Sequence, residues 1–241
     1  AVWRFNTAVA SRLDEIQSQD SSLMLLEVDF EPDTYDDGHI PGAGKIDWEH
    51  DLAGELGRSI VNKTGFEGLL GDRGITEEST VVLYGDKANF FAAHAYWLFR
   101  YYGHDDVRLL NGGREFWLDN DYSVTDEVPA FSETSYEAGE PDESIRAYRD
   151  DVEDAIEADT PLVDVRSPEE FTGEILAPPG LQETAQRGGH IPGASNISWT
   201  SVTNDDGTFK SAEELEEVYA DVLADGDDEI VAYCRIGERS S

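Results

Sequence analysis

The sequence predicts an α/β protein made of two tandem domains, each with a mostly parallel sheet flanked by helices. Short, nearly continuous apolar runs alternate with amphipathic segments, as expected for parallel strands that helices cover on both faces. One set of motifs also occurs twice, at a constant separation in the chain. The length of 241 residues is enough for two small domains.

The duplicated motifs are an apolar β-prone run, a Gly-His-Ile-Pro-Gly-Ala turn and a tryptophan. They lie at residues 25–29, 38–43 and Trp48 in the first copy and at 161–166, 189–194 and Trp199 in the second. The distance along the chain from His39 to His190 equals that from Trp48 to Trp199. Duplication of one domain explains this regularity. Because the turn also occurs in a copy without a cysteine, we expect His190 to be structural.

The first domain, residues 1–125, is expected to alternate helices with strands. Apolar residues at three- and four-residue spacing predict a helix over 7–17, and continuous apolar runs predict strands over 23–28, 81–84 and 107–110. An aromatic-rich segment closed by Gly103 predicts a helix over 89–102, and the Asn111-Gly112-Gly113 turn leads into a helix that ends at Asp119. The polar, glycine-rich residues between the first turn and about Arg73 are interpreted as irregular.

Residues 126–143, with two prolines and several Ser and Glu, have the composition of an interdomain linker. The second domain, residues 144–241, is expected to contain helices over 148–158 and 212–223. Strands are expected over 162–165 and 230–233, and residues 174–189 form a Pro/Gly-rich loop. Ser167, followed by a proline and two acids, has the pattern of a helix N-cap.

The final strand delivers Cys234, the only cysteine, to a loop that holds Arg235 and Arg239. A thiol acts as a nucleophile in its anionic form, and the ordinary thiol pKa of ~8.5 falls beside cations or a helix N-terminus. Lone cysteines are more often small buried apolar residues. Cys234, however, ends an apolar run and is followed at once by charged residues and a glycine. This placement favours a reactive role.

Residues 234–240, Cys-Arg-Ile-Gly-Glu-Arg-Ser, resemble the active-site loop of the rhodaneses, the thiosulfate sulfurtransferases whose cysteine carries a persulfide. Four residues separate Cys234 from Arg239, which suits one sulfur atom; the related tyrosine-phosphatase loop is one residue longer and holds phosphate. Charged Arg235 and Glu238 resemble the thiosulfate type, whereas the mercaptopyruvate type usually has small neutral residues there. The resemblance implies two tandem rhodanese-like domains over nearly the whole chain.

The resemblance also implies the roles of the site residues. Cys234 would take the outer sulfur of thiosulfate and pass it to a thiophilic acceptor such as cyanide, without a metal or an organic cofactor. The substrate-binding residues would be the rest of the loop: Arg235, Ile236, Gly237, Glu238 and Arg239. In the first copy Gly85 stands at the cysteine position, which predicts a non-catalytic domain.

Three further residues are candidates near this loop. Asp164 and Arg166, at the end of a predicted strand, are expected to hold the loop by charge-assisted hydrogen bonds. Some two-domain rhodaneses have an additional basic residue on the next helix, where this chain has Glu169 and Glu170. Arg187 is a weak substitute for that cation. No His and Cys spacing predicts a metal site.

The second copy ends soon after its active-site loop. Seven residues follow Cys234, whereas about 35 residues of helix, strand and helix follow Gly85 in the first copy. We therefore expect the second domain to be incomplete at its C-terminus, without the helix that should face the sulfur.

The composition limits the partners. The formal net charge is −36, from 53 acidic and 17 basic residues, which disfavours nucleic acid and anionic membranes. Because the acidic residues are distributed over segments that are predicted to fold, the composition suggests a salt-adapted protein. One cysteine allows no internal disulfide and fits a reducing cytoplasm, and no run is long and apolar enough to span a bilayer. The oligomeric state is left open.

Two other classes of function remain open at this stage. A non-catalytic sulfur carrier or binding module would bear sulfur or dock a partner without turnover. A phosphatase of the same general fold, or a mercaptopyruvate sulfurtransferase, is disfavoured by the length and the charge of the loop.

Overall fold

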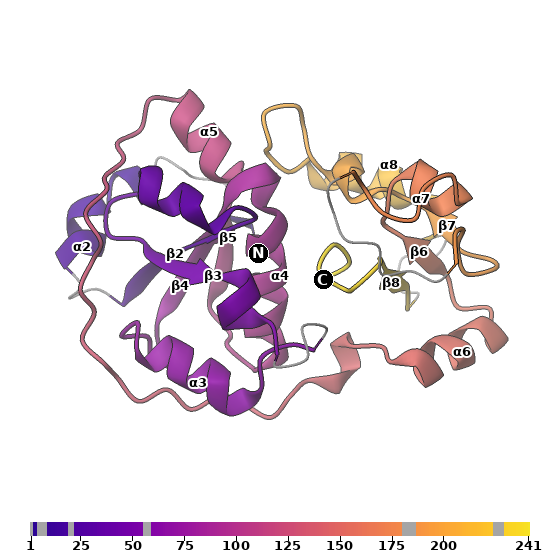
Figure 1. The fold of residues 1–241 in the computed structure, drawn as a ribbon, viewed down its shortest axis with the longest axis horizontal. Coiled ribbons are helices and arrows are strands. Elements are labelled where there is room, and N and C mark those ends of the chain that lie inside the picture. The colour runs from indigo at the N-terminus through magenta and orange to yellow at the C-terminus, as the bar shows by residue number, and fades with distance from the viewer. Residues whose placement is uncertain (1, 4–8, 19–21, 55–58, 180–186, 224–228) are drawn as a thin grey trace. The chain divides into compact units, whose positions relative to one another are not determined.

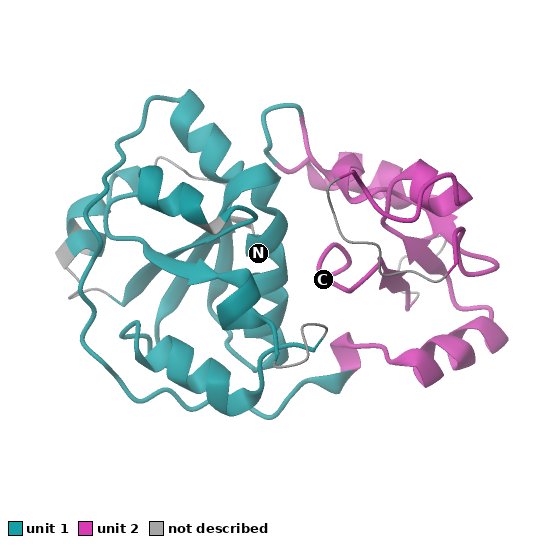
Figure 2. Cartoon of the chain, in the orientation of Figure 1, with its two compact units in different colours: residues 1–143, 205–208 teal, residues 144–204, 209–241 magenta. Residues whose placement is uncertain are grey.

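The computed structural model describes residues 2–3, 9–18, 22–54, 59–179, 187–223 and 229–241. The chain forms two compact units (Figure 2). Unit 1 comprises residues 1–143 and 205–208, and unit 2 comprises residues 144–204 and 209–241.

Unit 1 contains a five-stranded sheet in which every paired neighbour is parallel (Figure 1). In order across the sheet, the strands are β1 (Val2–Trp3), β5 (Val107–Leu110), β4 (Thr80–Tyr84), β2 (Leu23–Asp29) and β3 (Gly44–Asp47). All seven residues of the central strand β2 are buried. This burial explains why β2 is a continuous apolar run rather than an alternating one.

Helices flank the sheet of unit 1. They are α2 (Leu13–Ser18), α3 (Lys63–Gly71), α4 (Asp86–Tyr101) and α5 (Gly113–Asp119), with short helical turns at Pro32–Asp37 and Trp48–Leu52. Ile16 of α2 and Trp117 of α5 pack in one core cluster with Leu25 of β2. Helices α3 and α4 meet through Phe66 and Phe99, whose rings contact edge to face at 5.2 Å between centroids.

The structure confirms the predicted strands and corrects the expectation for the segment up to Arg73. That segment, expected to be irregular, contains strand β3 and helix α3. Asn62 caps α3 by accepting the Gly65 amide on its side-chain oxygen at 2.9 Å, and Phe66 anchors the helix in the core. The helix expected over 7–17 is interrupted by a turn at 11–12, and its residues 7 and 8 lie outside the described part of the chain.

Residues 126–143, expected to be a linker, run along unit 1 without regular structure up to Asp142. Tyr136 and Ala138 are buried there. The Tyr136 hydroxyl lies 3.0 Å from Nδ1 of His104, and the Ala138 amide donates to the carboxylate of Glu67 at 3.1 Å. The segment is therefore part of the packing of unit 1.

Unit 2 contains a parallel sheet with the order β7 (Ser195–Asn196), β6 (Leu162–Asp164) and β8 (Val231–Tyr233). Its helices are α6 (Arg149–Glu157), α7 (Pro168–Thr172) and α8 (Ala212–Tyr219), with a short turn of helix at Trp199–Val202 and another, Glu143–Ile145, at its boundary with unit 1. Ser167 caps α7 as predicted, because its hydroxyl accepts the Glu170 amide at 3.3 Å. Val163, Val165 and Val222 form a small core cluster.

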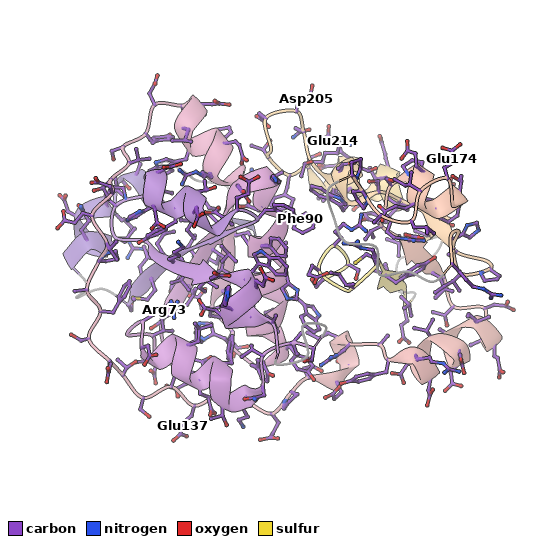
Figure 3. The ribbon with its side chains drawn as sticks, in the orientation of Figure 1. Arg73, Phe90, Glu137, Glu174, Asp205 and Glu214 are labelled. Carbon is purple, nitrogen blue, oxygen red and sulfur yellow. The ribbon has the colours of Figure 1, made fainter. Side chains whose placement is uncertain are left out.

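Many acidic side chains are exposed on the folded surface, whereas Glu27, Asp29, Asp86, Asp164 and Glu170 are buried. Glu137, Glu174, Asp205 and Glu214 are exposed and point outward in Figure 3. Among the described residues, no helix is both long and apolar enough to cross a membrane.

Candidate active site

Strand β8 places Cys234 at the carboxyl edge of the unit 2 sheet. β8 pairs with β6 so that Tyr233 lies opposite Asp164, and Cys234 is the first residue beyond the pair. The cysteine is half-buried and packs partly against the cluster of Val163, Val165 and Val222. Ligands usually bind at this edge of a parallel sheet.

The loop after Cys234 curls back toward the sulfur. Gly237 donates its backbone N–H to Sγ of Cys234 at 3.1 Å. The backbone φ angle of Gly237 is 110°, a value that residues other than glycine rarely adopt. Because an amide donor stabilises negative charge on an acceptor, this amide is placed to stabilise an anion at this position.

Arg239 closes the loop through an ion pair with helix α7. Its Nη1 and Nη2 atoms donate to the two carboxylate oxygens of Glu170 at 2.7 and 2.8 Å. Burial of the guanidinium opposes its charge, but the hydrogen bond to Glu170 and the neighbouring Cys234 sulfur raise the pKa of Arg239 above its usual range. Burial also opposes the charge of Glu170, yet Arg239 holds the pKa of that carboxyl below its ordinary value.

The remaining loop residues differ in exposure. Ile236 is 37% exposed, whereas Glu238 is partly buried, and this burial raises the pKa of Glu238. Arg235 and Arg239 oppose that shift through their charges. Arg187 is exposed, and within the described residues no hydrogen bond or ion pair joins it to the loop.

Asp164 and Arg166 form a buried pair at the end of β6. Nη2 of Arg166 donates to Asp164 at 2.6 Å and to the backbone oxygen of Gly189 at 2.8 Å. The hydrogen bond with Asp164 raises the pKa of Arg166. The Tyr233 hydroxyl accepts the Ile191 amide at 3.0 Å. The pair and this tyrosine therefore join the strand ends to the Gly-His-Ile-Pro-Gly-Ala turn.

A family model for the rhodanese-like domain matches residues 9–120 and 148–241. The chain belongs to the rhodanese family. These two segments of one family account for the internal duplication, and each lies mainly within one compact unit.

Relatives in this family cover nearly all of the chain. A protein of Haloferax volcanii, named "Putative thiosulfate sulfurtransferase", is 62% identical over 97% of this chain and 82% of its own length. A protein of Saccharopolyspora erythraea with the same name is 54% identical over 91% of this chain and 78% of its own length. The sulfur carrier protein TtuD of Thermus thermophilus is 50% identical over 92% of this chain and 80% of its own length.

Solved structures share the fold. The 3-mercaptopyruvate sulfotransferase SseA of Escherichia coli has a TM-score of 0.80 at 22% identity and covers the whole of this chain and 92% of its own. EanB in complex with ergothioneine also has a TM-score of 0.80, at 25% identity over 96% of this chain, and this chain spans 61% of the length of EanB.

The two rhodanese segments build their Gly-His-Ile-Pro-Gly-Ala turns alike. His39 stacks on Tyr35 at 3.7 Å between ring centroids, and His190 stacks on Phe171 at 3.6 Å. Nδ1 of each histidine lies within hydrogen-bond distance of the backbone oxygen of its stacking partner, at 3.0 Å in the first segment and 2.8 Å in the second. These shared contacts support a structural role for His190.

The first rhodanese segment has no room for a cysteine at the corresponding position. Gly85 follows Tyr84 of β4 as Cys234 follows Tyr233 of β8. A Cβ atom on Gly85 would lie 2.1 Å from the backbone oxygen of Val28. The next amide, that of Asp86, donates to a side-chain oxygen of Asp29 at 2.9 Å. The Asp29 side chain is therefore already the acceptor for the first amide after Gly85.

Sequence reasoning missed the partnership of Glu170 with the rhodanese loop. From the sequence, Glu170 is distinctive only as an acid in the region where some two-domain rhodaneses have a basic residue. The residues after Ser167 indicated a helix N-cap, but nothing local indicated that the Glu170 carboxylate reaches Arg239, 69 residues away. Among the described residues, no group of His, Cys, Asp or Glu could hold a metal ion.

Proposed function

We propose that this rhodanese is a thiosulfate sulfurtransferase that carries sulfur as a persulfide on Cys234. The observation that carries the proposal is the sulfur of Cys234 at the sheet edge, with the Gly237 amide donating to it at 3.1 Å. The names of the Haloferax and Saccharopolyspora relatives support thiosulfate as the donor. The charged loop residues Arg235, Glu238 and Arg239 support it as well.

The transfer occurs in two displacements. The Cys234 thiolate attacks the outer sulfur of thiosulfate, a new S–S bond forms, and the old S–S bond breaks with its electron pair leaving on sulfite. The persulfide anion then lies beside the loop amides. In the second step a thiophilic nucleophile such as cyanide attacks the outer sulfur, and thiocyanate leaves as Cys234 regains its thiolate.

Positive charge at the loop attracts the donor. Arg235 and Arg239 both follow the cysteine in the loop, and Ile236, Gly237 and Glu238 lie between them. Asp164 and Arg166 fix the neighbouring strand end, as their buried pair supports. Arg187 remains a weaker candidate for a third cation.

The first segment is proposed to be non-catalytic. The close approach of Val28 to Gly85 supports this, because a side chain at position 85 requires a shift of the backbone.

A second candidate function is that of a sulfur carrier. The TtuD relative supports it, because that protein is named a sulfur carrier. A carrier loads Cys234 from a donor and passes the sulfur to a protein partner, without efficient turnover with cyanide. A phosphatase activity is disfavoured because the loop has four residues between Cys234 and Arg239.

The experiment that tests the proposal is thiosulfate:cyanide sulfurtransfer, followed as thiocyanate release. The wild-type protein should turn over and the Cys234→Ser variant should not. Turnover of p-nitrophenyl phosphate or of mercaptopyruvate in place of thiosulfate would contradict the assignment. A stable persulfide with no release to cyanide would favour the carrier function.

A further inference from the structure

Glu170 is a buried carboxylate that faces the active-site loop. Within its own helix, Glu170 completes the capping box of α7: one of its carboxylate oxygens accepts the Ser167 amide at 3.3 Å. The same side chain is fully buried and accepts both terminal nitrogens of Arg239. One carboxylate thus connects the helix start after β6 to the loop after β8.

The geometry of this ion pair restricts what Arg239 can do. A guanidinium presents two parallel N–H donors that match a carboxylate or another oxyanion. In Arg239 that forked edge faces Glu170, and the side chain of Arg239 is only 11% exposed. An oxyanion substrate cannot take the same edge while the pair is intact.

Charge leads to the same conclusion. Glu170 offsets the positive charge of Arg239, so the pair attracts an approaching dianion weakly. Arg239 nevertheless neighbours the sulfur and contributes to its setting, because the loop that Arg239 closes also holds Sγ of Cys234 through the Gly237 N–H at 3.1 Å. The guanidinium is therefore suited to holding the sulfur atom in place.

We infer that Glu170 is a positioning residue that acts through Arg239, and that Arg239 fixes the loop and the Cys234 sulfur instead of gripping the oxygens of the substrate. The inference rests on the proposed sulfur transfer and refines the role of one loop residue in it. A misplaced nucleophile slows the chemical step, whereas a lost substrate contact weakens binding. The two roles are therefore separable in kinetics.

The first test is single-turnover persulfide formation with thiosulfate in Glu170→Gln. The rate at saturation should fall roughly tenfold or more, while the half-saturating thiosulfate concentration stays within about twofold. Glu169→Gln is the matched control, since Glu169 is an exposed acid on the same helix. A Glu170→Gln protein that behaves as wild type, or that changes only the half-saturating concentration, would overturn the inference.

The second test is the pH profile of Cys234 alkylation by iodoacetamide, which needs no sulfur transfer. Removal of a negative charge near the sulfur would by itself move the profile to lower pH. Release of Arg239 from its place beside the sulfur should instead move it to higher pH in Glu170→Gln. The other charges near the pair, Arg235 and Glu238 of the loop and Arg166 just after β6, are unchanged in this variant. A shift to lower pH would contradict positioning.

Two further variants keep the inference testable. Arg239→Lys retains the charge but loses the fork, so it should show the same loss of rate and replaces Glu170→Gln if that protein fails to fold. The double variant Glu170→Gln with Arg239→Gln should be no slower than the slower single variant. Additive losses would overturn the inference. A wild-type protein that forms no persulfide would contradict the proposed function, and the alkylation profile would still decide the role of Glu170.

Discussion

Tyr233 accepts the backbone N–H of Ile191 on its phenolic oxygen at 3.0 Å. The equivalent contact in unit 1 joins Tyr84 to Ile40, also at 3.0 Å. In both units the tyrosine is the last residue of the strand before the loop position, at Gly85 or Cys234. The hydroxyl therefore fixes the distance between that strand end and the duplicated turn.

Tyr233→Phe should destabilise unit 2, because the Ile191 amide loses its acceptor. The expected cost is about 1 kcal/mol in the free energy of unfolding, measured by urea denaturation. Tyr219→Phe is the control, because Tyr219 packs against the same core cluster as Cys234 and its hydroxyl makes no hydrogen bond to any residue that the structure describes. Equal losses in the two variants would show that the hydroxyl of Tyr233 contributes nothing specific.

Gly85→Cys should not create a second sulfur carrier. Its Cβ would lie 2.1 Å from the Val28 oxygen, so the strand must shift and unit 1 should lose about 2 kcal/mol or more. Thermal unfolding and the number of persulfides per chain measure the two effects. Gly68→Ala is the control, because nothing lies within 4 Å of a Cβ there. A stable Gly85→Cys protein that loads two sulfur atoms would contradict this account.

The buried Asp29 should make the free energy of unfolding of unit 1 fall as the pH rises. Burial and the neighbouring Glu27 raise the pKa of Asp29 from 3.8 to about 9. Between these values the folded protein keeps a proton that the unfolded chain has lost, so stability falls with increasing pH, by at most ~1.4 kcal/mol per pH unit. Asp29→Asn should flatten this slope in urea denaturation between pH 5 and pH 8.

The control for this slope is Asp119→Asn, a change at an exposed acid. It should leave the pH dependence as in the wild type. If Asp29→Asn retained the full slope, another group would be responsible for it.

The sequence predicted those elements whose signal is local. The strands β2, β4 and β5 are apolar runs, and Ser167 caps α7 through a short-range pattern. Strand β3 was missed because Gly44–Asp47 is short, carries Lys45 and Asp47, and pairs on one edge alone, with β2. Helix α3 was missed because it contains three glycines and its stability comes from tertiary packing.

The active site was likewise predictable only where its residues are close together in sequence. Cys234 and its loop were recognisable because the residues that matter are adjacent in sequence. The ion pair of Glu170 with Arg239 was not, because it joins residues 69 positions apart. Such contacts depend on how β6 and β8 align, which no local pattern encodes.

Salt should improve the apparent affinity for thiosulfate. The net charge of −36 repels a dianion over long distances, and molar salt reduces the Debye length to about 3 Å, so only the local field of the loop survives. The Michaelis constant should fall as KCl rises from roughly 0.1 M toward molar concentrations. Circular dichroism must show an intact fold throughout. A Michaelis constant that worsens steadily with salt would count against the proposed attraction.

The most direct test is the mass of the peptide that contains Cys234 after the protein is treated with thiosulfate. The account predicts a gain of about 32 Da, one sulfur atom, on Cys234. Cyanide should remove the added mass, and Cys234→Ser should not acquire it. An unmodified Cys234 in folded protein at saturating thiosulfate would contradict sulfur transfer by this chain.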